Sequence, residues 1–178
     1  GSYGKDTRGI LRVHQFDKVE MVAFIRPEDD ETEREKMLSI AEKIVRGLNL
    51  PYQVVQLASG DLGFPSAETT DIETWIPSQG RYRETHSIST TTDFQSRRLN
   101  IRYEKIEMVQ ARVKGHYPET VSAPFPRHEY LHILNGTAIA IGRTIIAIME
   151  NYQQKDGSIA IPKALQKYTN FSEIRPKK

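Results

Sequence analysis

The 178-residue chain contains no cysteine, which excludes disulfide bonds, thiolate metal sites and a cysteine nucleophile. It also has no apolar run long enough to cross a bilayer, and its first residues show no charged-then-apolar signal pattern. Lys and Arg number 25 against 23 Asp and Glu, so the net charge of +2 gives no broad basic field for non-specific nucleic-acid binding. These absences favour a cytoplasmic protein with no membrane partner.

The composition that remains is that of an ordinary folded protein. Hydrophobic residues make up 38% of the chain and charged residues 27%, which is typical of a soluble globular domain and not of a disordered one. The length matches one domain, and we expect residues 1–178 to belong to a single catalytic or binding unit.

The hydrophobic patterning predicts an α+β fold. Residues 11–25 predict a strand that is apolar on both parities, which is typical of a central, buried strand. A long connector over 104–133, a hairpin or an extended excursion, is broken by glycine and prolines. Short strands separated by few helices indicate a mostly antiparallel sheet flanked by helices. The other expected elements are a helix introduced by residues 27–30 that carries Met37 to Leu48, a short helix that starts at Asp93, and helices at 141–152 and after 162. The expected strands lie at 54–57, 71–76, 83–89 and 132–138.

The predicted first strand carries a possible ligand-binding set. Arg12, Phe16 and Glu20 share one parity and would project from one face of an extended strand. Phe16 and Glu20 would lie about 13 Å apart, roughly the span of a nucleotide joined to a small ligand. Glu20 is also the lone charge within the apolar stretch. The alternative is an aromatic cross-strand contact with a structural ion pair.

Two further positions suggest phosphate and metal chemistry. Arg143 lies at the start of a strongly apolar helical segment, where its guanidinium must find an anion or reach water. Phosphate suits the planar fork of arginine, although an ion pair with Glu20 or Glu84 would serve equally. Glu84 and Ser87 stand three residues apart on a polar strand and could hold Mg²⁺ beside a polyphosphate, or simply form a solvated strand edge.

One motif is misleading. The string His128-Glu129-Tyr130-Leu131-His132 matches the zinc-protease pattern, which requires a helix to bring both imidazoles to one metal. Pro124 and Pro126 precede it, so we expect an extended segment. In a strand the two imidazoles would stand about 13 Å apart, too far to share an ion.

Several strings, in the correct order, resemble the bacterial-type seryl-tRNA synthetases, a class II family. Residues 4–20 are similar to the motif 2 loop and its second strand, and residues 80–103 resemble the family's central stretch. Residues 134–153 are similar to motif 3, and residues 156–165 to the family's tail. Only the connector 104–133 departs from the pattern, because it is longer than usual. The resemblance implies the catalytic fold of class II synthetases, an antiparallel sheet flanked by helices.

The resemblance also implies a reaction and a set of site residues. Serine would be activated by ATP with Mg²⁺, giving seryl-adenylate and pyrophosphate, and the seryl group would pass to tRNA(Ser). It implies Phe16 stacking on adenine, Arg143 covering its other face and reaching the γ-phosphate, and Arg12 meeting the phosphates. Glu20, Asn135 and Thr137 would receive serine, and Glu84 and Ser87 would hold Mg²⁺. The ATP site would comprise Arg12, Val13, Phe16, Glu84, Thr85, His86, Ser87 and Arg143.

The same resemblance identifies parts of the family pattern that this sequence lacks. The upstream motif 2 strand, motif 1 with its role in homodimer formation, the serine loop and the tRNA-gripping arm are not found in it. We therefore expect a C-terminal part of the catalytic domain, with little or no activity alone. Two alternatives stay open: a non-catalytic binding or regulatory module, and an amino acid–carrier-protein ligase. The ligases of that kind use a cysteine-bound zinc, which this sequence does not provide.

Overall fold

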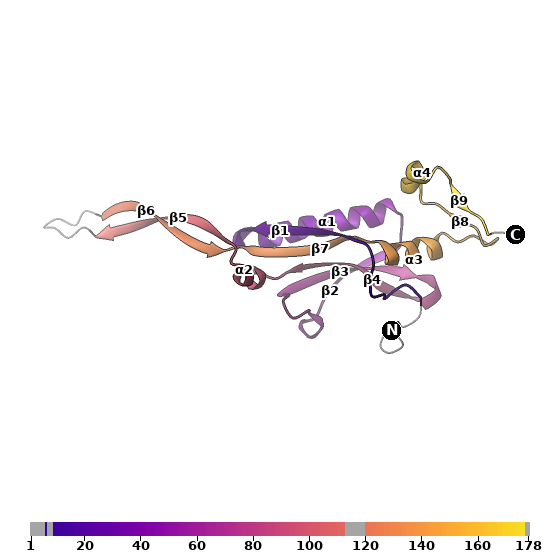
Figure 1. The fold of residues 1–178 in the computed structure, drawn as a ribbon, viewed down its shortest axis with the longest axis horizontal. Helices are drawn as coiled ribbons and strands as arrows, with labels where there is room; N and C mark the ends of the chain where they lie inside the picture. Colours follow the sequence, from indigo (N-terminus) through magenta and orange to yellow (C-terminus); the bar gives the residue numbers. More distant parts are fainter. Residues whose placement is uncertain (1–5, 7–8, 113–119, 177–178) are drawn as a thin grey trace.

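A five-stranded antiparallel sheet forms the body of the protein, in the strand order β1-β7-β4-β3-β2. The computed structural model describes residues 6, 9–112 and 120–176. The strands are β1 (Lys18–Ile25), β2 (Tyr52–Gln56), β3 (Glu68–Ile76), β4 (Arg81–Thr90) and β7 (His132–Ala140). The expected class II type of fold, a mostly antiparallel sheet flanked by helices, is confirmed (Figure 1).

Helices α1 (Asp30–Gly47) and α3 (Ile141–Asn151) bury one face of the sheet. Met37, Ala41 and Val45 recur every four residues along α1, so they form the stripe that packs on the strands. Their partners are the strand residues Ile72, Ile76, Ile88 and Leu134, with Ala147 from α3. Pro27 opens the short 3-10 turn Pro27–Asp29 that leads into α1, and acidic residues occupy the first turn of the helix.

The packing of α1 depends on a glycine in the middle of the sheet. A Cβ at Gly136 would lie 3.1 Å from both Met37 Cε and Ile88 Cγ1. Because Gly136 has no side chain, α1 can approach β7 closely at this position.

Strand pairing gathers polar side chains on that opposite face. Antiparallel partners point to the same side of a sheet, and the face away from α1 receives Glu20 with Thr137, Asp71 with Ser87, and Glu73 with Glu84. A bulge between Ile72 and Glu73 shifts the β3–β4 register by one residue, which turns Glu84 toward this polar face. The sheet is therefore apolar where the helices pack and polar where a ligand could bind.

Two expectations for the first strand are wrong. Residues 11–17 form bends and irregular chain, and β1 begins only at Lys18. Strand β1 is also an edge strand, and Val19, Val22 and Phe24 are each more than half exposed. Apolar residues on both parities favour a buried strand, but within the described chain only β7 pairs with this strand.

The expected connector is a long hairpin. Strands β5 (Arg102–Arg112) and β6 (Thr120–Tyr130) pair antiparallel and project from the sheet as a two-stranded ribbon (Figure 1). Pro124 and Pro126 do not break it, because alternate residues of an outer strand need no partner for their N–H. The zinc-like string lies in this extended region, as expected, and its last residue, His132, bonds Asp30 Oδ2 at 2.6 Å through Nδ1.

Small elements complete the chain. Helix α2 (Phe94–Leu99) follows β4. Near the C-terminus, α4 (Lys163–Thr169) connects β8 (Ile159–Ala160) to β9 (Glu173–Ile174), and these two short strands pair antiparallel. Of the helices in the described ranges, none is both long and apolar enough to pass through a membrane.

Candidate functional site

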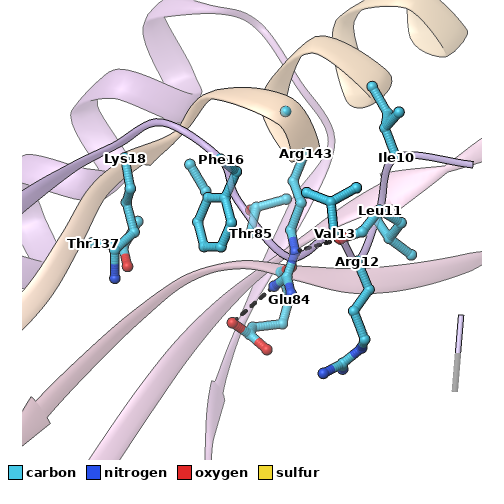
Figure 2. Close-up of a pocket in the computed structure, with 12 residues that line it drawn as sticks. Ile10, Leu11, Arg12, Val13, Phe16, Lys18, Glu84, Thr85, Thr137 and Arg143 are labelled. Carbon is cyan, nitrogen blue, oxygen red and sulfur yellow. Dashed lines mark hydrogen bonds and ion pairs between the residues drawn. The ribbon is translucent and has the colours of Figure 1, made fainter. Parts of the chain in front are cut away.

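A cavity of about 190 Å³ opens where the irregular chain before β1 meets the sheet and the start of α3 (Figure 2). Its wall comes from residues 10–13 with Phe16, the β4 residues Glu84 and Thr85, and Gly142 with Arg143 at the beginning of α3. Lys18 of β1 and Thr137 and Ala140 of β7 complete it. The backbone N–H of Ile141 donates to Asp17 O at 3.0 Å and ties the start of α3 to this loop. The loop thus takes the place that the sequence assigned to a strand, and it still delivers Arg12, Val13 and Phe16 to the cavity.

Arg143 holds the cavity wall together. Its Nη1 donates to Glu84 Oε1 at 3.0 Å and to the Glu84 carbonyl at 2.9 Å, and its Nε donates to the Leu11 carbonyl at 3.1 Å. The guanidinium is thereby fixed against β4, and Figure 2 shows it beside the ring of Phe16, which is 55% exposed. A flat aromatic ring and a flat cation in one cavity form a suitable pair of surfaces for a planar, electron-rich ring.

Glu20 lies next to this cavity and already binds an ammonium group. Its Oε2 lies 2.6 Å from Lys18 Nζ, and the hydroxyl of Thr137 donates to the same oxygen at 3.4 Å. Lys18 and Thr137 line the cavity, so the carboxylate borders it through its partners. Asn135 is the Cα partner of Val22 and of Ser89 and does not line either cavity described here.

A second cavity, of about 500 Å³, adjoins the first and shares Leu11, Arg12, Glu84 and Arg143 with it. The remaining charged lining comprises Arg81, Arg83, Asp61, Asp71 and Glu73. Arg83 is braced by an ion pair with Asp6 and by a bond to Gln79 Oε1 at 2.9 Å. Arginines beside carboxylates suit a polyanion bound with a divalent cation, since the arginines contact phosphate oxygens and the carboxylates contact the metal.

Asp71 is the functional candidate that the sequence reasoning missed. It is 7% exposed, and its Oδ1 has no hydrogen-bond partner within the described structure. Burial, chiefly, raises the pKa of Asp71 to about 6; a hydrogen bond with Ser87 opposes this, and the charges of Glu84 and Glu73 add to it. The alternation of Asp71 and Glu73 with apolar residues could have identified them, because it places both on the polar face of a strand that neighbours the one carrying Glu84 and Ser87.

The structure does not bring every expected ATP residue into the cavities. Thr85 lines the first cavity, although it is almost fully buried and bonds Thr74 Oγ1 at 2.6 Å. Ser87 lines neither cavity but sits opposite Asp71 in the sheet. His86 also lines neither, because it pairs with Ile72 on the helix-covered face, where it is 2% exposed.

The burial of His86 predicts a pH-dependent stability. Burial lowers the pKa of His86 to about 4, with a smaller opposing effect of the Ala138 backbone. The unfolded chain, with a pKa near 6.5, therefore binds more protons between pH 6.5 and 4, so stability falls as the pH drops through this range. The full effect is about 3 kcal/mol, since one pKa unit corresponds to about 1.4 kcal/mol.

Urea denaturation of the wild type and His86→Gln between pH 4 and 7 measures this effect. The difference in unfolding free energy between the two should shift in favour of the variant as the pH falls. Other titrating groups, including Asp71, whose pKa is raised, contribute equally to the unfolding free energies of both proteins and cancel in the difference. A difference that stays constant over the whole range would contradict a neutral, buried His86.

Comparisons with known proteins agree with this geometry. Residues 2–117 match the family described as the tRNA synthetase class II core domain (G, H, P, S and T). The serine–tRNA ligases of Thermodesulfovibrio yellowstonii and Dictyoglomus thermophilum are 50% and 52% identical over 98% and 100% of this chain, which covers 37% and 38% of their lengths. The chain therefore spans little more than a third of these relatives.

Solved structures show the same likeness. The seryl-tRNA synthetase of Pyrococcus horikoshii, complexed with ATP, has a TM-score of 0.82 and 46% identity over 98% of this chain and 35% of its own. The cytoplasmic serine–tRNA ligase of Naegleria fowleri, in complex with AMP, has a TM-score of 0.80 and 35% identity over 98% of this chain and 37% of its own. The polar sheet face, the Phe16–Arg143 cavity and these matches agree, and the chain belongs to the class II tRNA synthetase core-domain family.

Proposed function

We propose that this chain forms part of a serine–tRNA ligase and binds ATP in the Arg143 cavity. The observation that supports this best is the meeting of Phe16, Arg143 and Glu84 in one cavity, beside a second cavity rich in arginine. The matched relatives carry the name serine–tRNA ligase, and one of the similar structures contains ATP. The purine would lie between the Phe16 ring and the Arg143 guanidinium, and the phosphates would extend toward Arg12.

The proposed chemistry relies on positioning and charge. A serine carboxylate oxygen attacks the α-phosphorus of ATP, the α–β phosphoanhydride bond breaks, and pyrophosphate leaves. A terminal ribose hydroxyl of tRNA(Ser) then attacks the seryl carbonyl carbon, and AMP leaves with the phosphate oxygen. No step needs a covalent bond to the protein, so the residues act by orienting the reactants and neutralising phosphate charge.

The oxygen donors of the second cavity, together with Ser87 opposite Asp71 in the sheet, fit Mg²⁺. Glu84 and Ser87 supply the carboxylate and hydroxyl oxygens that this hard cation prefers, and the buried, unpartnered oxygen of Asp71 lies beside them. When bound, Mg²⁺ neutralises phosphate charge. Glu84 has a second task, because its carboxylate also fixes Nη1 of Arg143.

Serine would bind at Glu20, where Thr137 already donates to the carboxylate. The ammonium of Lys18 occupies that carboxylate in the free protein, and an amino acid's ammonium would take its place. The proposal includes L-serine and tRNA(Ser) as substrates, a homodimer in the full-length protein and a cytoplasmic location.

Calorimetric titration with ATP, and with a non-hydrolysable seryl-adenylate analogue, tests this function. We expect both to bind, and we expect the full-length protein to catalyse serine-dependent ATP–pyrophosphate exchange. Binding without exchange by the full-length protein would favour a non-catalytic module instead. Failure of ATP to bind at all would contradict the nucleotide site itself.

A further inference from the structure

Asp71 is a buried carboxylate with an unmet bonding capacity. It is 7% exposed and lines the second cavity, and its Oδ1 has no hydrogen-bond partner among the described residues. A buried carboxylate oxygen without a partner costs free energy, and native proteins usually satisfy such atoms with a donor, a water or a metal ion. A buried oxygen of this kind on a cavity wall therefore indicates an external partner.

Neighbouring arginines do not supply that partner. The hydrogen bonds of Arg143 go to Glu84 and Leu11, and those of Arg83 go to Asp6 and Gln79. Asp71 therefore lines the second cavity with a buried Oδ1 that has no partner, while the Arg143 and Arg83 guanidinium groups on the same wall bond to other residues.

The sheet register brings Asp71 to the expected metal ligands. Asp71 and Ser87 are direct cross-strand partners, and such residues place their Cβ atoms about 5 Å apart. Glu84 pairs with Glu73 on the same face, one step farther along the sheet. Two carboxylates on the wall of the second cavity, Glu84 and Asp71, and the hydroxyl of Ser87 opposite Asp71 in the sheet thus supply the hard oxygen atoms that Mg²⁺ prefers.

We infer that Asp71 is a third protein ligand of the divalent cation held by Glu84 and Ser87, and that the nucleotide phosphates complete the coordination. This inference rests on the proposed ATP site. Among the residues that the structure describes, no three carboxylates or imidazoles converge closely enough to hold a metal ion alone. Cation binding must therefore depend on the nucleotide, with Asp71 adding affinity only when phosphates are present.

Mn²⁺, a paramagnetic substitute for Mg²⁺, provides the test. Free Mn²⁺ is followed by electron paramagnetic resonance during titration of the full-length protein, with and without the non-hydrolysable analogue AMP-PNP. We expect nucleotide-dependent binding that Asp71→Asn weakens about 10- to 100-fold, the usual cost of losing a metal-site partner. Affinity for metal-free AMP-PNP should not fall, because a negative charge has been removed from beside the phosphates.

Glu73→Gln is the matched control, because it removes one negative charge from the same cavity wall. Glu73 accepts a hydrogen bond from Gln53 Nε2 at 2.6 Å, so its carboxylate already has a partner. We expect this variant to weaken Mn²⁺ binding by no more than about 3-fold, as a through-space charge effect would. Equal losses in the two variants, or no loss in Asp71→Asn, would overturn the assignment.

A measurement on the unaltered sequence makes the result independent of how the variants fold. Protein labelled with ¹³C-aspartate should show electron–nuclear coupling between bound Mn²⁺ and a carboxyl carbon, because the other protein ligands are Glu84 and Ser87. Absence of that coupling would reject Asp71 as a ligand. If AMP-PNP fails to bind without metal, the proposed function is what has failed.

Discussion

Replacing Arg143 by alanine is expected to weaken ATP binding about 100-fold, because truncating one member of a hydrogen-bonded charge pair costs about 2–5 kcal/mol. The guanidinium bonds Glu84 through both its side chain and its carbonyl, and it also bonds the Leu11 carbonyl. Its loss would remove one surface of the purine site and leave the Glu84 carboxylate without its cation. Titration calorimetry with ATP measures the change.

Arg143→Lys separates the shape of the side chain from its charge. Lysine keeps the positive charge but loses the planar fork and the flat surface beside Phe16, so we expect an affinity between those of the wild type and the alanine variant. A lysine variant equal to the wild type would indicate that only charge matters and that no stacking occurs. Amide exchange of residues 9–17 would report whether the alanine variant has released the loop instead.

The sequence predicted the body of the fold well because each element had its own periodicity. Met37, Ala41 and Val45 marked the helix-packing stripe of α1, and the alternation in residues 71–76 marked β3. The error at residues 11–17 has a physical origin. Arg12 and Phe16 can reach the same ligand either from one face of a strand or from an irregular loop, so their spacing does not distinguish the two. The loop is fixed by hydrogen bonds from Arg143 and Ile141, which are distant in the sequence.

Site residues could be predicted where a charged residue stood in an unusual sequence context. They could not be predicted where their position depended on how the strands pair. Arg143 in an apolar helix start required an anion, and it has Glu84. His86 was assigned to the cavity with its neighbours, but the β-bulge between Ile72 and Glu73 shifts the strand pairing, and His86 lies on the helix-covered face. Asp71 was missed for the same reason, because its closeness to Ser87 comes from pairing between two strands.

Glu20 should determine the choice of amino acid, and Glu20→Ala is expected to reduce kcat/KM for serine roughly 1,000-fold. The carboxylate already bonds an ammonium, that of Lys18 at 2.6 Å, and it accepts from Thr137. ATP affinity should change by no more than about 3-fold, because Glu20 does not line the cavity wall formed by Phe16 and Arg143. Pyrophosphate exchange against serine, together with ATP titration, measures both quantities in the full-length protein.

Two further variants identify what Glu20 recognises. Glu20→Gln retains a hydrogen-bond acceptor but loses the charge, so it should spare serine binding if the partner is the hydroxyl and impair it if the partner is the ammonium. Lys18→Gln removes the resident ammonium and should leave serine affinity unchanged or raise it, since the amino acid then displaces nothing. Equal losses for serine and ATP in Glu20→Ala would contradict the assignment, because only a general disturbance of the sheet would affect both ligands alike.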